Sequence, residues 1–220
     1  MNKLTIFHGS PIIIEKPIYG YGNPHNDYGV GFYCTTELEL AKEWGTKNGE
    51  VGYANEYELN LKGLKILDLT DSKYSILTWI AILVANREIT SKFIETYKDE
   101  LEYLKTYELD VFKYDVVIGY RADDAYFAFP RDFVSNNLSL EKLQEIFFLG
   151  KLGTQIVLVS KKAFESLSFV KAHKTSREDY TRYHQKIENA KDKYLKIRTE
   201  ERKHKGKYIV DLMEEDIKNV

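Results

Sequence analysis

The segment from residue 17 to residue 31 limits the possible folds of this chain most, because turn-forming residues dominate it. They are Pro17, Gly20, Gly22, Asn23, Pro24, Asn26, Asp27, Gly29 and Gly31. Such a density disfavours a helix or a strand and predicts a loop of about 15 residues. Loops of this length inside a compact domain are often functional. Alternating apolar residues at 3–7 and the run at 32–34 predict a short strand on each side of the loop.

The rest of the first 171 residues mixes strand and helix patterns. Further strands are predicted at residues 56–61, 64–69, 114–120, 154–159 and 168–171. Helices are predicted after Thr35 and Thr36, which offer an N-cap, and at residues 75–85, 91–107, 139–149 and 162–167. A length of 220 residues suits one domain with or without an appendage. We therefore expect an α+β fold.

The pattern changes after residue 171. Apolar side chains recur there at a spacing of 3-4-3-4-3, at Tyr180, Tyr183, Ile187, Ala190, Tyr194 and Ile197. This spacing predicts a helix with a heptad seam of about two and a half repeats. We divide the chain into a domain at residues 1–171 and a charged helical extension at 172–220. The seam either folds back on the domain or pairs with a partner helix or a second copy.

Composition narrows the functional classes. The net charge is −2, which does not favour nucleic acid as a partner of the whole surface, although a local basic patch would suffice. Cys34 is the single cysteine, so an internal disulfide is impossible. The longest apolar stretch, at 76–85, is about half the length that spans a bilayer. Because Pro11 and its neighbours interrupt the first apolar run, we expect no signal peptide and a cytoplasmic protein without membrane contact.

Three short motifs carry the chemical interpretation. The first is the sequence FHGS at residues 7–10, the second is DYGVGFYCT at residues 27–35, and the third is Gln155 at the start of a late strand. Each one alone has a structural explanation, such as a turn, a tight glycine loop or a surface position on a strand. Their order along the chain is the informative feature.

Taken in order, these motifs resemble the ADP-ribosyltransferase superfamily. More narrowly, the chain resembles a bacterial family of uncharacterised transferase-like domains with an HGS opening and a D-x-G-x-GFY-x-T motif. That pattern continues with a YD-x-x-x-G strand, an ADD loop and a Q-[IV] strand, which here are Tyr114, Asp115 and Gly119, then Ala122, Asp123 and Asp124, then Gln155 and Ile156. The resemblance covers residues 4–60 and 114–160 and excludes the C-terminal helix.

The resemblance implies a split β-sandwich of two antiparallel sheets with flanking helices and NAD bound in the cleft between them. It also implies that His8 bonds the adenosine ribose, that the backbone of Gly9 holds the nicotinamide amide, and that Tyr33 stacks on the nicotinamide ring. The loop at 18–30 would wall the site. The implied NAD-binding residues are His8, Gly9, Ser10, Asp27, Gly29, Gly31, Phe32 and Tyr33.

The implied catalytic residues are His8, Tyr33 and Gln155. In the superfamily the third position is usually glutamate, which bonds the nicotinamide-ribose 2′-hydroxyl and steadies an oxocarbenium-like transition state. The amide of Gln155 can position the ribose but brings no negative charge, a loss that typically costs about 100- to 1,000-fold in rate. Asp123 and Asp124 could supply a carboxylate toward a target hydroxyl or amine. A solvated acidic turn explains them equally well.

We therefore expect an enzyme, a mono-ADP-ribosyltransferase that cleaves the nicotinamide–ribose bond of NAD and modifies a protein or a nucleic acid. By analogy, it would act as a bacterial toxin or phage-defence effector checked by an antitoxin. Two alternatives stay open: a catalytically silent module that binds NAD or ADP-ribose, and an interaction protein that uses the seam at 180–197. The five histidines show no metal-ligand spacing, so NAD as substrate and no metal are expected.

Overall fold

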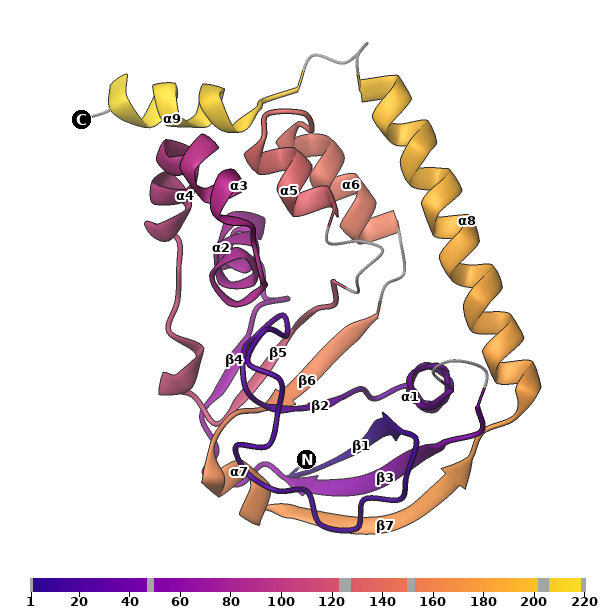
Figure 1. Ribbon diagram of the computed structural model, residues 1–220. Helices are drawn as coiled ribbons and strands as arrows, with labels where there is room; N and C mark the ends of the chain where they lie inside the picture. Colours follow the sequence, from indigo (N-terminus) through magenta and orange to yellow (C-terminus); the bar gives the residue numbers. More distant parts are fainter. Residues whose placement is uncertain (1, 47–49, 123–127, 150–152, 202–205, 219–220) are drawn as a thin grey trace.

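A computed structural model describes residues 2–46, 50–122, 128–149, 153–201 and 206–218. The chain folds into an α+β structure with two sheets (Figure 1). The α+β class that the sequence predicted is therefore confirmed. Figure 1 shows the sheet that contains β1 at the base of the molecule, the second sheet above it, and a group of helices above both.

The first sheet has the strand order β1-β3-β7 and is antiparallel throughout. Its strands are β1 (Lys3–Ser10), β3 (Tyr53–Asn60) and β7 (Leu167–Lys174). β1 pairs with β3 along its whole length, and the pairing of β3 with β7 contains one irregularity between Glu56 and Tyr57. The central strand β3 is thus enclosed on both edges.

The second sheet has the order β2-β6-β5-β4 and is mixed. Its strands are β2 (Phe32–Cys34), β6 (Thr154–Leu158), β5 (Val116–Tyr120) and β4 (Ile66–Asp68). The β4–β5 pair is parallel, so the implied arrangement of two antiparallel sheets is wrong at this edge. The reason is the connection: helices lie between β4 and β5 in the chain, and such a crossover returns the second strand in the same direction as the first.

The second sheet lies between two hydrophobic clusters because successive strand residues point to opposite faces. On one face Ile156 and Leu158 pack with Ile6 and Tyr57 of the first sheet. On the other face Val157 packs with the helices. The two sheets are also joined by a β-bridge, in which the Phe7 and Thr35 backbones exchange hydrogen bonds of 2.8 and 2.9 Å. The bridge fixes the end of β1 beside β2.

The helices mostly cover the upper face of the second sheet (Figure 1). They are α1 (Leu38–Gly45), α2 (Ile76–Asn86), α3 (Ser91–Thr96), α4 (Lys98–Lys105), α5 (Ala128–Val134), α6 (Leu140–Leu149) and α7 (Lys161–Glu165), with a 3-10 turn η2 (Val111–Lys113). α2 is apolar nearly all round and supplies the centre of the upper cluster, capped at its start by Ser75. The single helix predicted over 91–107 is two helices, because the backbone leaves the helical conformation at Tyr97.

The C-terminal extension consists of α8 (Arg177–Glu201) and α9 (Ile209–Lys218). β7 continues to Lys174, so the sheet crosses the predicted boundary at residue 171. α8 starts three residues earlier than the seam because Ser176 and Asp179 form a reciprocal cap, with the Ser176 amide bonded to Asp179 Oδ2 at 2.7 Å. α9 lies within the predicted helical extension, which the sequence analysis did not divide into two helices, and its Ile209 is fully buried in the upper cluster.

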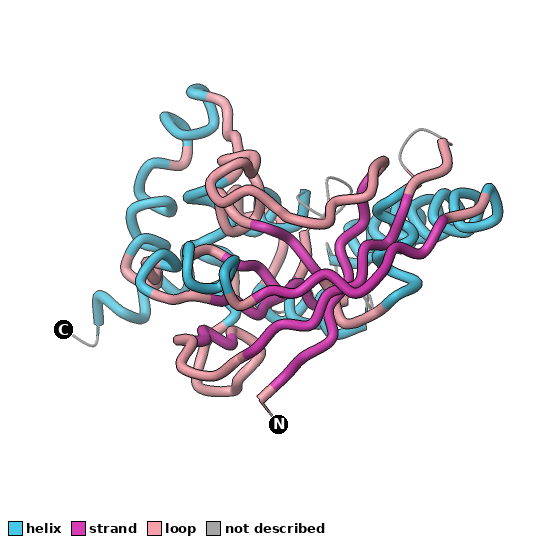
Figure 2. The backbone as a smooth tube through the Cα atoms, turned by 90° about the horizontal axis from the view of Figure 1, so that it is seen from below, coloured by secondary structure: helices cyan, strands magenta, loops and turns pink. Residues whose placement is uncertain are grey.

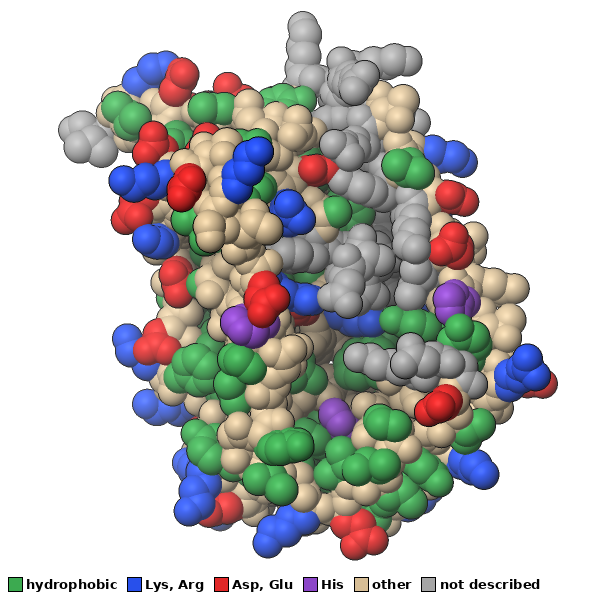
Figure 3. Space-filling model, viewed as in Figure 1, with side chains coloured by type: hydrophobic (Ala, Val, Ile, Leu, Met, Phe, Trp, Pro, Cys, Tyr) green, Lys and Arg blue, Asp and Glu red, His purple; other side chains and the backbone are tan. Residues whose placement is uncertain are grey.

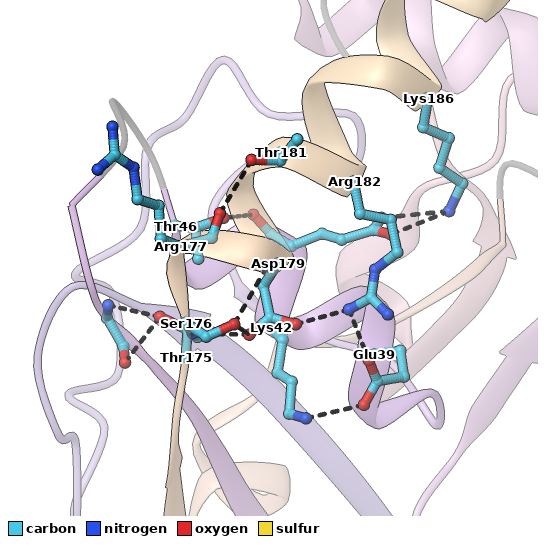
Figure 4. A network of polar contacts seen from close by, with 12 residues as sticks. Glu39, Lys42, Thr46, Thr175, Ser176, Arg177, Asp179, Thr181, Arg182 and Lys186 are labelled. Carbon is cyan, nitrogen blue, oxygen red and sulfur yellow. Dashed lines mark hydrogen bonds and ion pairs between the residues drawn. The ribbon is translucent and has the colours of Figure 1, made fainter.

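α8 lies along the side of the domain and contacts α1 (Figures 1 and 2). Figure 4 shows the polar contacts at its first turns, where Arg182 bonds Glu39 and Asp179, each at 2.6 Å. Lys186 reaches the buried carboxylate of Glu43. The start of α8 therefore packs on its own domain.

The heptad seam remains a prediction. Tyr180 and Tyr183 are half-buried, whereas the side chains of Ile187, Ala190, Tyr194 and Ile197 lie outside the described residues. Across the described parts of the chain, no helix is both long and apolar enough to cross a membrane.

Candidate functional site

His8 sits near the end of β1, where the bridge to Thr35 brings the two sheets together. Its ring stacks on Phe32 with centroids 4.2 Å apart, and Nδ1 lies 2.7 Å from the carbonyl oxygen of Tyr33. Burial lowers the pKa of His8, while the hydrogen bond to Tyr33 partly opposes this change. A neutral ring that donates from Nδ1 leaves Nε2 as an acceptor, and Nε2 makes no hydrogen bond within the described residues.

Phe32 and Ser10, two of the predicted ligand contacts, support the backbone here. Phe32 is only 8% exposed and lies under the ring of His8. The Ser10 hydroxyl accepts from the amide of Ile12 at 3.3 Å, and the residue is 5% exposed. Both residues shape the site through His8 and the following turn.

Tyr33 fixes the end of the glycine loop. Its hydroxyl donates to the Gly29 carbonyl at 2.7 Å and accepts from the Tyr28 amide at 3.0 Å. Since Tyr33 pairs with Val157 on β6, its ring points to the helix face of the second sheet. Burial is the main cause that raises the pKa of Tyr33, so the hydroxyl stays protonated at ordinary pH. The residue as a whole is half-buried.

Two glycines of the loop are required by close packing. Gly29 has a φ of +73°, and a Cβ at this position would meet Asn86 Oδ1 at 2.7 Å. At Gly31 a Cβ would meet Val157 Cγ1 at 2.6 Å. The glycines therefore let the loop press against α2 and β6, and this contact positions the loop beside the start of β6.

Gly9 has a packing role that the sequence analysis did not predict. A Cβ on Gly9 would lie 2.2 Å from the Ala41 carbonyl oxygen and 2.5 Å from Trp44 Cβ, so its absence lets α1 cross β1. The backbone of Gly9 still has an open side. The amide and carbonyl of Phe7 bond Thr35 and so face away from β3. This direction alternates from residue to residue along a strand, so the amide and carbonyl of Gly9, two residues further on, also face away from β3.

Trp44, on α1, lies beside Gly9. Its indole Nε1 is buried and is the single sealed side-chain polar atom without a partner in the described residues. The Arg121 guanidinium lies over the ring, 5.2 Å from its centroid. A sealed donor without an acceptor costs free energy, so Trp44 Nε1 is a local energetic cost within the described residues.

Asp27 is a buried junction of the fold. It is 4% exposed, and Oδ1 accepts from Arg87 Nε at 2.8 Å and Nη2 at 2.7 Å. Oδ2 accepts from the Ala122 amide at 2.8 Å and from Gln155 Nε2 at 2.6 Å. Burial raises the pKa of Asp27, and the nearby Arg87 charge is the largest opposing influence. All its partners donate hydrogen bonds and Arg87 supplies a counter-charge, an arrangement that favours the ionised carboxylate.

Gln155 is the second residue of β6 and points to the same face of the sheet as Val157 and Tyr33. It is 5% exposed, and only its amide nitrogen is bonded, to Asp27. Its Oε1 makes no hydrogen bond in the described part of the chain. Trp44 Nε1 is the single side-chain polar atom in the described residues that is both sealed from solvent and unpaired. Since Gln155 Oε1 is also unpaired, it is not sealed and keeps contact with solvent.

Asn55 and Arg87 are residues that the sequence analysis missed. Asn55 lies fully buried on β3; it donates to the His8 carbonyl at 3.3 Å and to the Ile12 carbonyl at 3.2 Å, and it accepts from Ile14 at 3.1 Å. It thereby ties the chain after β1 to the sheet. No local pattern indicates either residue, because their partners are tens of residues away.

The other candidates have different outcomes. Asp123 and Asp124 lie outside the described residues. Cys34 is fully buried between the sheets, and burial raises the pKa of its thiol well above the ordinary value, which disfavours a thiolate nucleophile. The residues that the structure describes contain no group of three or more histidine, cysteine, aspartate or glutamate side chains suited to a metal ion.

The fold therefore brings the backbones of the three motifs together, through the Phe7–Thr35 bridge and the pairing of β2 with β6. β1 contributes His8, β2 contributes Tyr33, and β6, the neighbour of β2, contributes Gln155. Figure 3 shows the molecule hollowed near the level where the two sheets meet, with a histidine side chain close to the hollow.

A family model described as a protein of unknown function (DUF3990) matches residues 4–169. The chain belongs to this family. The match covers β1 through most of β7 and leaves out α8 and α9. No curated protein and no solved structure showed significant similarity to the chain.

The unsatisfied polar groups of this DUF3990 domain suit a ligand that both donates and accepts hydrogen bonds. His8 Nε2 and Gln155 Oε1 are acceptors without a partner in the described residues. The amide and carbonyl of Gly9, which point away from β3, add a backbone donor and acceptor. Tyr33, half-buried as a residue, lies on β2, the strand that pairs with the Gln155 strand β6. A nucleotide, with ribose hydroxyls, an aromatic base and amide or phosphate acceptors, has this combination.

Proposed function

We propose that this protein is a mono-ADP-ribosyltransferase that cleaves NAD between nicotinamide and ribose and transfers ADP-ribose to a macromolecule. The observation that carries the proposal is the 2.7 Å hydrogen bond from His8 to the Tyr33 carbonyl, beside the strand that bears Gln155. The first two motifs and Gln155, which follows them by more than 100 residues, thus lie on adjacent strands in the order the superfamily resemblance implies. In this proposal the two sheets form the split β-sandwich of that superfamily.

In this proposal each residue has its own contact with NAD. His8 Nε2 accepts a hydrogen bond from a ribose hydroxyl, and the Gly9 backbone bonds the nicotinamide amide. The Tyr33 ring packs against the nicotinamide. Gln155 Oε1 accepts from a hydroxyl of the nicotinamide ribose and holds the anomeric carbon in position while the bond to nicotinamide breaks. The target nucleophile then attacks that carbon, nicotinamide leaves with the bonding electron pair, and the target's proton passes to a base or to water.

A binding module that does not turn NAD over is the second candidate. Gln155 favours it, because an amide lacks the negative charge that stabilises a developing cation. The same polar groups of His8 and Gly9 would then serve recognition alone. The two functions share a ligand and differ in whether nicotinamide is released.

The test uses the purified full chain, NAD labelled in its ADP-ribose part, and a bacterial lysate. We expect release of nicotinamide and covalent label on a macromolecule, both lost in Tyr33→Ala and His8→Ala. His184→Ala is the matched control, because His184 is exposed on α8. NAD binding measured by calorimetry without release or label would establish the binding module. Absence of both binding and release would contradict the proposal.

A further inference from the structure

We propose that Asp27 is a positioning residue that holds the Gln155 amide from behind, so that the carbonyl oxygen of Gln155 and not its amide nitrogen faces the reacting ribose. This inference rests on the proposed function. It changes the role of Asp27 from a ligand contact to a residue that acts through Gln155. It also identifies the part of the ligand that Gln155 takes, a hydroxyl group.

The argument begins with the two ends of a glutamine side chain. The NH2 group is a donor and the oxygen an acceptor, and the two are nearly equal in size. Packing alone therefore does not decide which end faces a ligand; a hydrogen-bonding partner must. For Gln155 that partner is Asp27 Oδ2, 2.6 Å from Nε2. An ionised carboxylate accepts and cannot donate, so it bonds only the NH2 end.

The carboxylate of Asp27 is itself fixed. Arg87 holds Oδ1, and the Ala122 amide bonds Oδ2, so neither oxygen can rotate away without breaking these contacts. Ala122 follows β5 directly, and β5 pairs with β6 with Gly119 opposite Gln155. The support comes from three segments far apart in the chain. Asp27 therefore imposes one orientation on Gln155 before any ligand arrives.

Two chemical consequences follow for the ligand. First, Gln155 presents an acceptor, so it selects a hydroxyl or an N–H and disfavours a phosphate or carboxylate oxygen. Second, a short hydrogen bond to an ionised group is stronger than a neutral one and polarises the amide, which makes Oε1 more negative. The charge of Asp27 thus acts on the ribose through Gln155 and supplies part of what a glutamate at position 155 would supply directly.

A double-mutant cycle at positions 27 and 155 tests this role. Asp27→Asn offers an NH2 group to Gln155, which turns the Gln155 amide and presents a donor to the ribose. We expect kcat for nicotinamide release to fall by about 100-fold with a much smaller change in KM. Gln155→Glu alone places two carboxylates in contact and raises the pKa of one of them, so its activity should gain a new dependence on pH.

The double variant Asp27→Asn with Gln155→Glu is the decisive member. The introduced asparagine would donate to one oxygen of the introduced glutamate, and the other oxygen would again be an acceptor for the ribose. We expect the double variant to recover at least tenfold in kcat over Asp27→Asn. A residue that only held the loop would show no recovery, because both variants carry the same asparagine at position 27. Urea unfolding of all four proteins shows whether each is folded.

Side-chain amide NMR of the wild-type chain covers the case in which Asp27→Asn prevents folding. The Gln155 amide signal is identified by its absence in Gln155→Ala. We expect its protons to exchange slowly with solvent and to stay protected when NAD is added, since they point to Asp27. Protons that exchange rapidly, or that lose protection with NAD, would overturn the proposed orientation.

The outcomes separate the two proposals. If the wild-type chain releases nicotinamide but the double variant is no better than Asp27→Asn, the role of Asp27 is overturned and the proposed function stands. If the wild-type chain neither binds NAD nor releases nicotinamide, the proposed function is overturned, and the role of Asp27 falls with it. Recovery in the double variant supports both.

Discussion

Lys186 of α8 places its Nζ 3.1 Å from Oε2 of Glu43, a residue of α1 that is only 4% exposed (Figure 4). This contact joins the C-terminal extension to the domain. Lys186 is the one side-chain partner of the Glu43 carboxylate among the described residues. α1 also packs over Gly9, so the extension supports the helix that borders the proposed site.

Lys186→Met should lower the free energy of unfolding by about 1–2 kcal/mol. The substitution leaves a buried carboxylate without its counter-charge, while the half-exposed Lys186 itself contributes little. Urea unfolding gives the value. Lys193→Met on the same helix is the control and should change stability by less than about 0.5 kcal/mol, because Lys193 is exposed. Equal effects of the two variants would show that the Glu43 contact has no special weight.

The stability of the protein should fall with acid through His8. Its folded-state pKa lies below the ordinary value of 6.5, so below pH 6.5 the unfolded chain binds a proton that the folded chain does not. The contribution is present above pH 6.5 and is lost as the pH falls toward the folded pKa, at up to about 1.4 kcal/mol per pH unit.

Unfolding by urea between pH 7.5 and 5 in wild type and His8→Asn measures this term, since the difference between the curves cancels most other groups. Asparagine retains a donor for the Tyr33 carbonyl and does not titrate. Parallel curves would mean that His8 takes up its proton equally in both states. The same experiment on His184→Asn should give a curve that runs parallel to that of wild type.

Gly9→Ala should destabilise the fold by about 2 kcal/mol or more, because the methyl group would collide with the Ala41 carbonyl and push α1 off β1. Thermal and urea unfolding check the loss. Gly20→Ala is the comparison: it has space for a methyl group within 4 Å but a φ of +80°, so it carries only the cost of backbone strain, about 1–2 kcal/mol. A Gly9→Ala protein as stable as wild type would contradict the close crossing of α1 and β1.

Tyr33→Phe separates the ring of Tyr33 from its hydroxyl. The change leaves the Gly29 carbonyl and the Tyr28 amide without their partner, and we expect a loss of about 1–3 kcal/mol in stability. Because the ring remains, NAD affinity should fall far less than in Tyr33→Ala. Calorimetric titration with NAD, performed where both variants are folded, compares the two. Equal losses of affinity would assign recognition to the hydroxyl.

Local chemistry is what the sequence by itself determined. The glycine- and proline-rich segment at 17–31 could form neither helix nor strand, and alternating apolar residues on each side required strands. The same local rules predicted β6 and the helices at 76–86 and 140–149 to within a few residues. They failed at Tyr97, where a continuous helical pattern is broken, and they did not separate α9, whose pattern is short and largely charged, from α8.

Only the tertiary structure decided how distant residues meet. The bond between Asp27 and Gln155 joins positions 128 residues apart, and Arg87 enters the same cluster from the end of α2. No periodicity or motif encodes such a contact, because it depends on strand order, register and the crossing of helices over sheets. The sequence analysis named Asp27 as an NAD contact and Gln155 as a catalytic residue, without linking them. Tertiary packing places Asp27 behind Gln155. A buried carboxylate needs hydrogen-bond donors, and here the fold supplies them from distant segments of the chain.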